Sequence, residues 1–286
     1  MNESILKRRW KKFKTLKRGY YSLVTLTVLY ALSFLLPILI NNRALIVKYE
    51  GSLHFPIFSG YISGKEFGQD VPGEAKYRKL KDQFAEQIGS GNWVLMPPYP
   101  YSPYEDITTE GNKMYEPPSR KHWLGTDNTG RDVFARLCYA FNISSSFALT
   151  LTLINYVIGV LIGGAMGYFG GKFDLIFQRL IEIWSSLPML FVIIILSSIL
   201  KPSFLLLIGI YTLVNWISMT YLMRAEFYRE KSRAYVAAAL SMGQSNFKVM
   251  YKHILPNSLV PIITYFPFAV VAGITALVGL DYLCLL

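Results

Sequence analysis

The chain has 286 residues, of which 52% are hydrophobic and only 16% are charged. This composition excludes an ordinary soluble globular protein, whose core needs far less apolar surface, and it predicts an all-α polytopic membrane protein. Many of the basic residues behind the net charge of +11 lie in two clusters, at 7–18 and 224–252. Such clusters mark the cytoplasmic side of membrane proteins, so the charge indicates topology and needs no nucleic-acid partner.

The first apolar run covers residues 20–40 and is long enough to cross a hydrocarbon layer of roughly 30 Å. It follows a basic tail at 1–19, and no small-x-small cleavage site comes after it. We therefore expect an uncleaved membrane helix with a cytoplasmic N-terminus. A tight outer turn is expected at Lys201-Pro202. Further membrane helices are predicted at about 146–169, 176–200, 203–223 and 258–280, which makes five in all.

Residues 41–141 carry twelve acidic and twelve basic residues, unlike the two basic clusters, and are therefore expected outside the cytoplasm. Strand-like runs at 44–58 and a charged helical stretch at 73–88 predict a small mixed module. The proline-rich stretch 97–103 continues neither kind of structure. Two interpretations remain open, a passive insertion and a surface that contacts a substrate-delivering protein.

The end of this region, residues 122–136, has the pattern of a rigid elbow before a membrane helix. Thr126 or Asp127 is expected to cap a turn, Gly130 to relax it, and Arg131 to reach Asp127 from one helical turn away. The candidate residues of the elbow are Gly125, Thr126, Asp127, Gly130, Arg131 and Asp132.

Three features of the predicted membrane helices leave alternatives open. Gly159, Gly163 and Gly167 recur every four residues, so one helix face lacks side chains and either packs closely on another helix or lines a substrate path. Pro188 should kink the third membrane helix, as in a gate or in an ordinary bundle. Asn215 either bonds a neighbouring helix or faces a polar path.

Residues 224–257 form a polar, basic interruption, which we call the coupling segment. Gly243 is predicted to end one short helix and Pro256 to end a second. The segment either lies on the membrane surface or docks on another subunit. The predicted apolar stripe on its two helices consists of Tyr235, Ala238, Ala239, Met242, Phe247, Met250, Tyr251 and Ile254.

The coupling segment resembles the coupling loop of ABC-importer permeases, which seats in a cleft of the ATPase subunit. The resemblance rests on two alanines, three further residues and a glycine, followed by Ile-Leu-Pro; Ala237 departs from it, because the family usually has Glu there. The elbow and the Gly170-Gly171 turn are similar to the corresponding segments in the dipeptide, oligopeptide and nickel branch of ABC permeases. The module at 41–120 looks like that of permeases for microcin C and oligopeptides. The matching coupling residues are Tyr235, Ala238, Ala239, Gly243, Ile254, Leu255 and Pro256.

The resemblance implies that residues 142–286 form the permease core of an inner-membrane, ATP-driven importer of peptides or peptide-like compounds. It implies as partners a second permease, two ATPase subunits and an extracytoplasmic solute-binding protein, in addition to the lipid bilayer. ATP and Mg would be bound by the ATPase subunits, and this chain has no G-x-x-x-x-G-K-[ST] loop. No catalytic site and no metal site is predicted, because the histidines and cysteines are scattered.

Two other hypotheses remain. The family usually has six membrane helices and a glycine where this chain has Cys284, so a truncated, inactive permease is one of them. The other is a non-transporting membrane anchor or scaffold whose 41–141 module binds an envelope partner.

Overall fold

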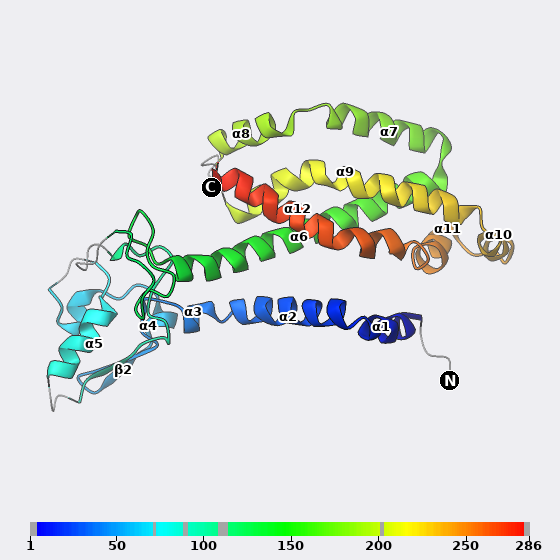
Figure 1. Cartoon of the computed structure of the whole chain (residues 1–286). Coiled ribbons are helices and arrows are strands. Elements are labelled where there is room, and N and C mark those ends of the chain that lie inside the picture. Colours follow the sequence, from blue (N-terminus) through cyan, green and yellow to red (C-terminus); the bar gives the residue numbers. More distant parts are fainter. Residues whose placement is uncertain (1–4, 71–72, 88–90, 108–113, 201–202, 283–286) are drawn as a thin grey trace. The chain divides into compact units, whose positions relative to one another are not determined.

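The computed structural model divides the chain into two compact units, Met1–Ile143 and Ser144–Leu286 (Figure 1). The structure describes residues 5–70, 73–87, 91–107, 114–200 and 203–282. The outer turn expected at Lys201-Pro202 and the residue Cys284 lie outside the described residues.

The first unit begins with a basic helix, α1 (Ile5–Thr15), and an apolar helix, α2 (Lys17–Ser33). A separate short helix, α3 (Leu36–Leu39), follows, with Pro37 in its first turn. Proline has no N–H group with which to continue the hydrogen bonds of a preceding helix. The bounds predicted for the first membrane helix, 20–40, are therefore wrong, because the continuous helix ends before the proline.

A small antiparallel sheet follows, formed by β1 (Ile46–Tyr49), β2 (Ser52–His54) and β3 (Trp93–Leu95) in the order β2-β1-β3. β1 and β2 form a hairpin with the two-residue turn Glu50-Gly51, whose φ angles are 47° and 82°. Positive φ at both turn residues matches the right-handed twist of the paired strands. Strand β3 is far away in the sequence but pairs with the other side of β1.

The core of this first unit lies between the sheet and α5. Tyr77, Leu80 and Phe84 fall on one face of the amphipathic α5 and are buried, together with Val47 and Val94 of the sheet. The module is thus held by ordinary apolar packing, and its place outside the cytoplasm stays a prediction. Its helical elements are α4 (Pro56–Ser59), η1 (Gly64–Phe67) and α5 (Tyr77–Glu86).

The second unit consists of helices. By length and composition, the described helices that can cross a membrane are Val133–Phe169 and Leu259–Asp281. The halves of α9, Phe204–Leu213 and Asn215–Lys231, are bent by 45° and add a third if they count as one span. The five predicted membrane helices are therefore not confirmed. The long helices are α6 (Val133–Phe169), α7 (Gly171–Ser185), α8 (Met189–Ile199), α9 (Phe204–Lys231) and α12 (Leu259–Tyr282).

The helix predicted at 176–200 is broken, which corrects the expected kink. α7 ends at Ser185, α8 begins at Met189, and Pro188 between them has an extended backbone with ψ of 100°. Proline removes one helical hydrogen bond and also pushes the residue before it out of the helical region. A break therefore forms where we expected a bend. The expected bounds of the neighbouring helices are also short, because α6 begins at Val133 and α9 continues to Lys231.

The glycine row of α6 packs directly on the backbone of α9. A Cβ atom placed on Gly163 would lie 2.2 Å from the carbonyl oxygen of Thr220, and one on Gly167 would lie 2.3 Å from that of Arg224. Gly159 has the same relation to Met219, at 2.7 Å from its Cβ. Even a methyl group would therefore force the two helices apart. Of the two uses weighed for this row, this geometry favours helix packing.

We predict that Gly163→Ala destabilises the second unit by roughly 1–3 kcal/mol, because the new methyl group overpacks the contact with α9. Gly209→Ala is the matched control, since Gly209 also lies in a helix but has no neighbouring atom within 4 Å of an added Cβ. Thermal unfolding of the purified protein in detergent measures both. Equal stability of the two variants would contradict the close α6–α9 contact.

Candidate functional site

The coupling segment starts as a helix. α9 continues through its first residues to Lys231, so the loop predicted from residue 224 is wrong in this part. The segment ends in an i to i−5 turn, in which the N–H of Leu255 donates to the carbonyl of Met250 at 2.8 Å. This turn belongs to η3 (Met250–Ile254), and two further short helices precede it, α10 (Ala234–Ser241) and α11 (Asn246–Val249).

Gly243 forms the corner between α10 and α11. Its φ angle is +76°, which glycine adopts without the penalty that a side chain brings. The N–H of Gly243 donates to the carbonyl of Leu240 at 2.9 Å, and that of Gln244 donates to the carbonyl of Ala239 at 3.2 Å. These bonds satisfy the last carbonyls of α10. The Gln244 side chain also meets Nε2 of His253 at 2.8 Å, which holds the two arms of the corner together.

One face of the coupling segment is buried in the second unit. Val236, Ala239, Val249 and Ile254 are each at most 1% exposed. They join an apolar cluster with residues of α6 and α9. The Tyr168 hydroxyl at the end of α6 also donates to Oδ1 of Asn246 at 2.7 Å. The segment is therefore anchored to the ends of both helices.

The other face is exposed although it is apolar. Met242 is 71% exposed, Phe247 is 77% exposed and Tyr251 is 68% exposed. The predicted apolar stripe is divided between the two faces, because it includes the buried Ala239 and Ile254 as well as these three exposed residues. Helical spacing alone does not say which apolar residues are buried. Of the other candidates, Ala238 and Pro256 are exposed, while Tyr235 and Leu255 are half-buried.

An ion pair fixes α7 to α9 where the coupling segment begins. Nε and Nη2 of Arg224 donate to the two carboxylate oxygens of Asp174, each at 2.6 Å. Gln178 donates to the same carboxylate at 2.9 Å. A bidentate pair of this kind fixes direction as well as distance. The first residues of the coupling segment therefore have a rigid contact with α7.

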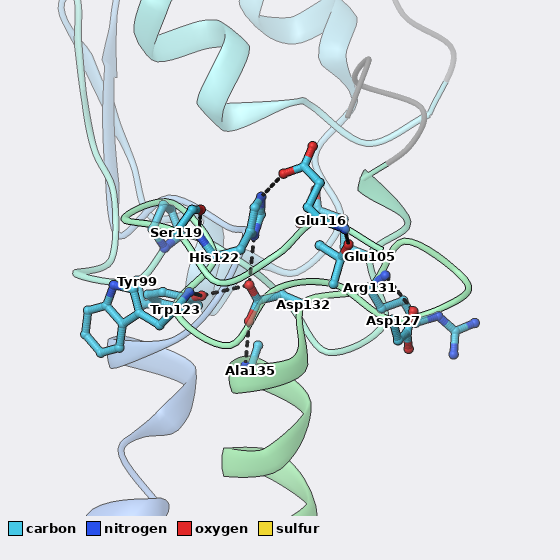
Figure 2. Close-up of polar contacts among 12 residues, drawn as sticks. Tyr99, Glu105, Glu116, Ser119, His122, Trp123, Asp127, Arg131, Asp132 and Ala135 are labelled. Atoms are coloured by element: carbon cyan, nitrogen blue, oxygen red, sulfur yellow. Dashed lines mark hydrogen bonds and ion pairs between the residues drawn. The ribbon is translucent and has the colours of Figure 1, made fainter. Parts of the chain in front are cut away.

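In the first unit, the elbow is built around the buried carboxylate of Asp132 (Figure 2). Its Oδ2 accepts a hydrogen bond from the Tyr99 hydroxyl at 2.7 Å and lies 2.8 Å from Nδ1 of His122. Its Oδ1 accepts the N–H of Ala135 at 2.8 Å, which satisfies a free donor in the first turn of α6. Burial, and then the bond to Asp132, raises the pKa of Tyr99.

A second carboxylate, Asp127, closes the turn ahead of the helix. Its Oδ1 accepts the N–H groups of Thr129 and Arg131, each at 2.9 Å. The predicted side-chain contact from Arg131 is replaced by this backbone bond, and the cation paired with Asp127 is Arg136 on α6. Burial by itself raises the pKa of Asp127, but the bonds from Arg131, Thr129 and Arg136 together lower it to about 2.

The remaining elbow residues set the path of the chain. Gly125 and Gly130 have φ angles of +74° and +70°, and a Cβ atom on Gly125 would lie 2.3 Å from the carbonyl oxygen of Glu116. The Thr126 hydroxyl accepts the N–H of Glu116 at 2.8 Å. Sequence reasoning did not select two members of the network, Tyr99 and His122. His122 stands at the start of the motif, whereas Tyr99 lies in a proline-rich stretch without a local signal.

No group of three or more His, Cys, Asp or Glu side chains that could hold a metal ion occurs within the described ranges. The free thiol of Cys138 is half-buried in the first turns of α6.

We predict that the Asp127 turn loses stability as the pH falls. The folded-state pKa of about 2 lies below the ordinary aspartate pKa of 3.8, so the stabilisation is present above pH 4 and is lost as the pH falls through 2. The loss amounts to about 1 kcal/mol, because solvent screens the partly exposed pair of Asp127 and Arg136. Asp127→Asn keeps an acceptor oxygen and removes the titration. Unfolding measured from pH 6 to pH 2 should show this difference between the two proteins, and parallel curves would contradict it.

Known proteins resemble the chain over nearly its full length. A family model described as "Binding-protein-dependent transport system inner membrane component" matches residues 159–285. The inner membrane ABC transporter permease protein YejE of Escherichia coli (strain K12) is 41% identical over 96% of this chain and 80% of its own length. The peptidoglycan transport system permease protein YejE of Agrobacterium fabrum is 36% identical over 97% of this chain and 78% of its own.

A shorter match connects the chain to another group of transporters. The dipeptide transport system permease protein DppC of Bacillus subtilis (strain 168) is 37% identical over 64% of this chain and 57% of its own length. The long matches extend over both the elbow and the coupling segment. The chain therefore belongs to the family of inner membrane permease components of binding-protein-dependent ABC transporters.

Proposed function

We propose that this chain is a transmembrane permease subunit of an ATP-driven importer of peptides or peptide-like compounds. The relatives support the substrate class, since their names include dipeptide, oligopeptide and peptidoglycan transport systems. Compounds of these classes share amide groups. The finer proposal, uptake of microcin C-like peptides together with oligopeptides, rests on the resemblance of the module at 41–120.

The proposed assembly contains a second permease, two ATPase subunits and an extracytoplasmic solute-binding protein. ATP and Mg belong to the ATPase subunits, and this chain binds no cofactor. The basic helix α1 (Ile5–Thr15) supports a cytoplasmic N-terminus, because positive residues stay on that side of the membrane. The sheet and α5 of the first unit would then lie outside the cytoplasm, where the solute-binding protein reaches them.

The observation that carries the proposal is the two-sided coupling segment. Its inner face is packed on α6 and α9, and its outer face exposes Met242, Phe247 and Tyr251. Exposed aromatic and methionine side chains are typical anchors of protein interfaces. An ATPase cleft that receives this outer face would transmit its motion directly to the inner face.

The contacts of α9 support the way in which such motion would travel. The coupling segment is continuous with α9 at Lys231, and Arg224 ties α9 to Asp174 of α7. The glycine row prevents α6 from separating from α9 without breaking a backbone contact. Movement of the coupling segment would therefore tilt these helices together and alternate access to a central path.

We predict that Phe247→Ser weakens ATPase docking without unfolding the chain, because the Phe247 side chain is exposed and contributes little to the core. Loss of one aromatic anchor should weaken the complex roughly tenfold or more. The measurement is co-purification of the ATPase subunits with the tagged permease in mild detergent. Phe58→Ser is the matched control, since Phe58 is 80% exposed in the other unit. Equal ATPase recovery with both variants would overturn the docking assignment.

Gly243→Val tests the corner itself. A β-branched residue at a φ of +76° is strained, so the two arms should lose their relative angle while the membrane helices still form. We expect the variant to reach the membrane but to lose ATP-dependent uptake. Normal uptake by this variant would contradict a coupling role for the corner.

A further inference from the structure

A cavity of about 250 Å³ lies among α6, α9 and α12 in the second unit. No residue of the coupling segment is among the described residues that line it. It adjoins the glycine row, because Met219 of α9 contacts Gly159 and also lines the cavity. Its wall is mixed, with polar groups on α6 and α9 and aromatic rings on α12. Its polar and aromatic residues include Asn155 and Tyr156 of α6, Asn215 of α9, and Tyr265 and Phe268 of α12.

Two polar groups of this wall have no hydrogen-bond partner in the part of the chain that the structure describes. They are Oδ1 of Asn155, a residue only 6% exposed, and the hydroxyl oxygen of Tyr156. Most buried polar atoms in proteins are hydrogen-bonded, and leaving one without a partner is unfavourable in an apolar environment. The two residues are adjacent on α6, in a helix long and apolar enough to cross a membrane.

Asn215, for which two roles remained open, lines the same cavity. Its Nδ2 donates to the carbonyl of Tyr211 at 3.0 Å. Both residues lie in α9, so this hydrogen bond does not connect Asn215 to a neighbouring helix. Polar residues inside a membrane helix usually face a bundle interior or a water-filled cavity. The position of Asn215 therefore agrees with a polar path.

We propose that this cavity binds the neutral amide groups of a transported peptide, with Asn155 as the main hydrogen-bonding residue and Tyr156 as the second. The proposal rests on the proposed function and names the part of the substrate that the permease contacts. The unpartnered atom of Asn155 is its amide oxygen, which is a hydrogen-bond acceptor. The side chain is therefore placed to accept an N–H from a peptide bond.

The composition of the wall argues for a neutral amide and against a charged terminus. No Asp, Glu, Lys or Arg is among the described residues that line the cavity. Tyr265 and Phe268 are respectively 47% and 69% exposed and offer apolar surface for side chains. Binding through the peptide backbone does not depend on peptide sequence. It also stays weak, as release on the other side of the membrane requires.

The decisive property of an unpartnered group is that removing it should not harm folding. We predict that Asn155→Leu and Tyr156→Phe leave the unfolding temperature unchanged or raise it, yet lower uptake of radiolabelled tri-alanine about three- to tenfold at subsaturating peptide. The assay uses the complete transporter, with both permeases, the ATPases and the solute-binding protein, in proteoliposomes. Thr220→Val is the matched control, since Thr220 is buried on α9 but bonds its own helix and does not line the cavity.

A second peptide identifies the group that is bound. Tri-alanine methylated on its amide nitrogens cannot donate, so wild-type uptake of it should fall to the level that Asn155→Leu shows with ordinary tri-alanine. The variant itself should show little further loss. Uptake that is unchanged in Asn155→Leu and in Tyr156→Phe overturns the proposal, and so does a loss that follows reduced stability. An equal methylation effect in wild type and variant also overturns it, because Asn155 is then covered by water or by the second permease.

The outcome also separates this inference from the proposed function. If the intact wild-type assembly hydrolyses ATP but takes up no tri-alanine, the peptide-importer proposal fails and the inference fails with it. If the wild type transports the peptide and the cavity variants transport it equally well, only the inference fails.

Discussion

The close contact between α6 and α9 is the constraint on which the second unit depends. Three glycines four residues apart bring the backbone of α6 against Met219, Thr220 and Arg224 of α9. In a membrane, where apolar side chains gain little by leaving lipid, such backbone contacts are a main source of helix association. The pair then provides a fixed surface on which Val236, Ala239, Val249 and Ile254 of the coupling segment are buried. A rigid pair of this kind allows a push at one end to reach the whole of both helices.

The same row of α6 explains where the cavity lies. Asn155 stands four residues before Gly159, so it continues the glycine face toward the other end of the helix. Where the row is glycine the helices touch, and where it becomes Asn155 the wall is polar and a cavity is present. One helix face thus combines packing with a hydrogen-bonding surface.

In the first unit, a single carboxylate holds the elbow on the start of α6. Asp132 caps the first turn of α6 and also contacts the side chains of Tyr99 and His122.

Several structural features could be predicted because they depend on neighbouring residues. Gly243 and Gly130 take positive φ angles at the turns where glycine was expected, and Asp127 caps its turn. The partner of Asp127 was predicted wrongly, since Arg131 is near in sequence whereas Arg136 is placed by the start of α6. The break at Pro188 was expected only as a kink, because proline chemistry alone does not decide between the two.

The membrane class, the basic clusters, the two motifs and their glycine corners follow from composition and local spacing, which are properties of short stretches of sequence. The folded chain was needed to show which apolar residues of the coupling segment are buried and which glycines contact α9. It was also needed to show that polar atoms of Asn155 and Tyr156 line a cavity without hydrogen-bond partners among the described residues. Those features depend on contacts between helices far apart in the chain. Helical periodicity places residues on a face, but the neighbouring helix decides what that face meets.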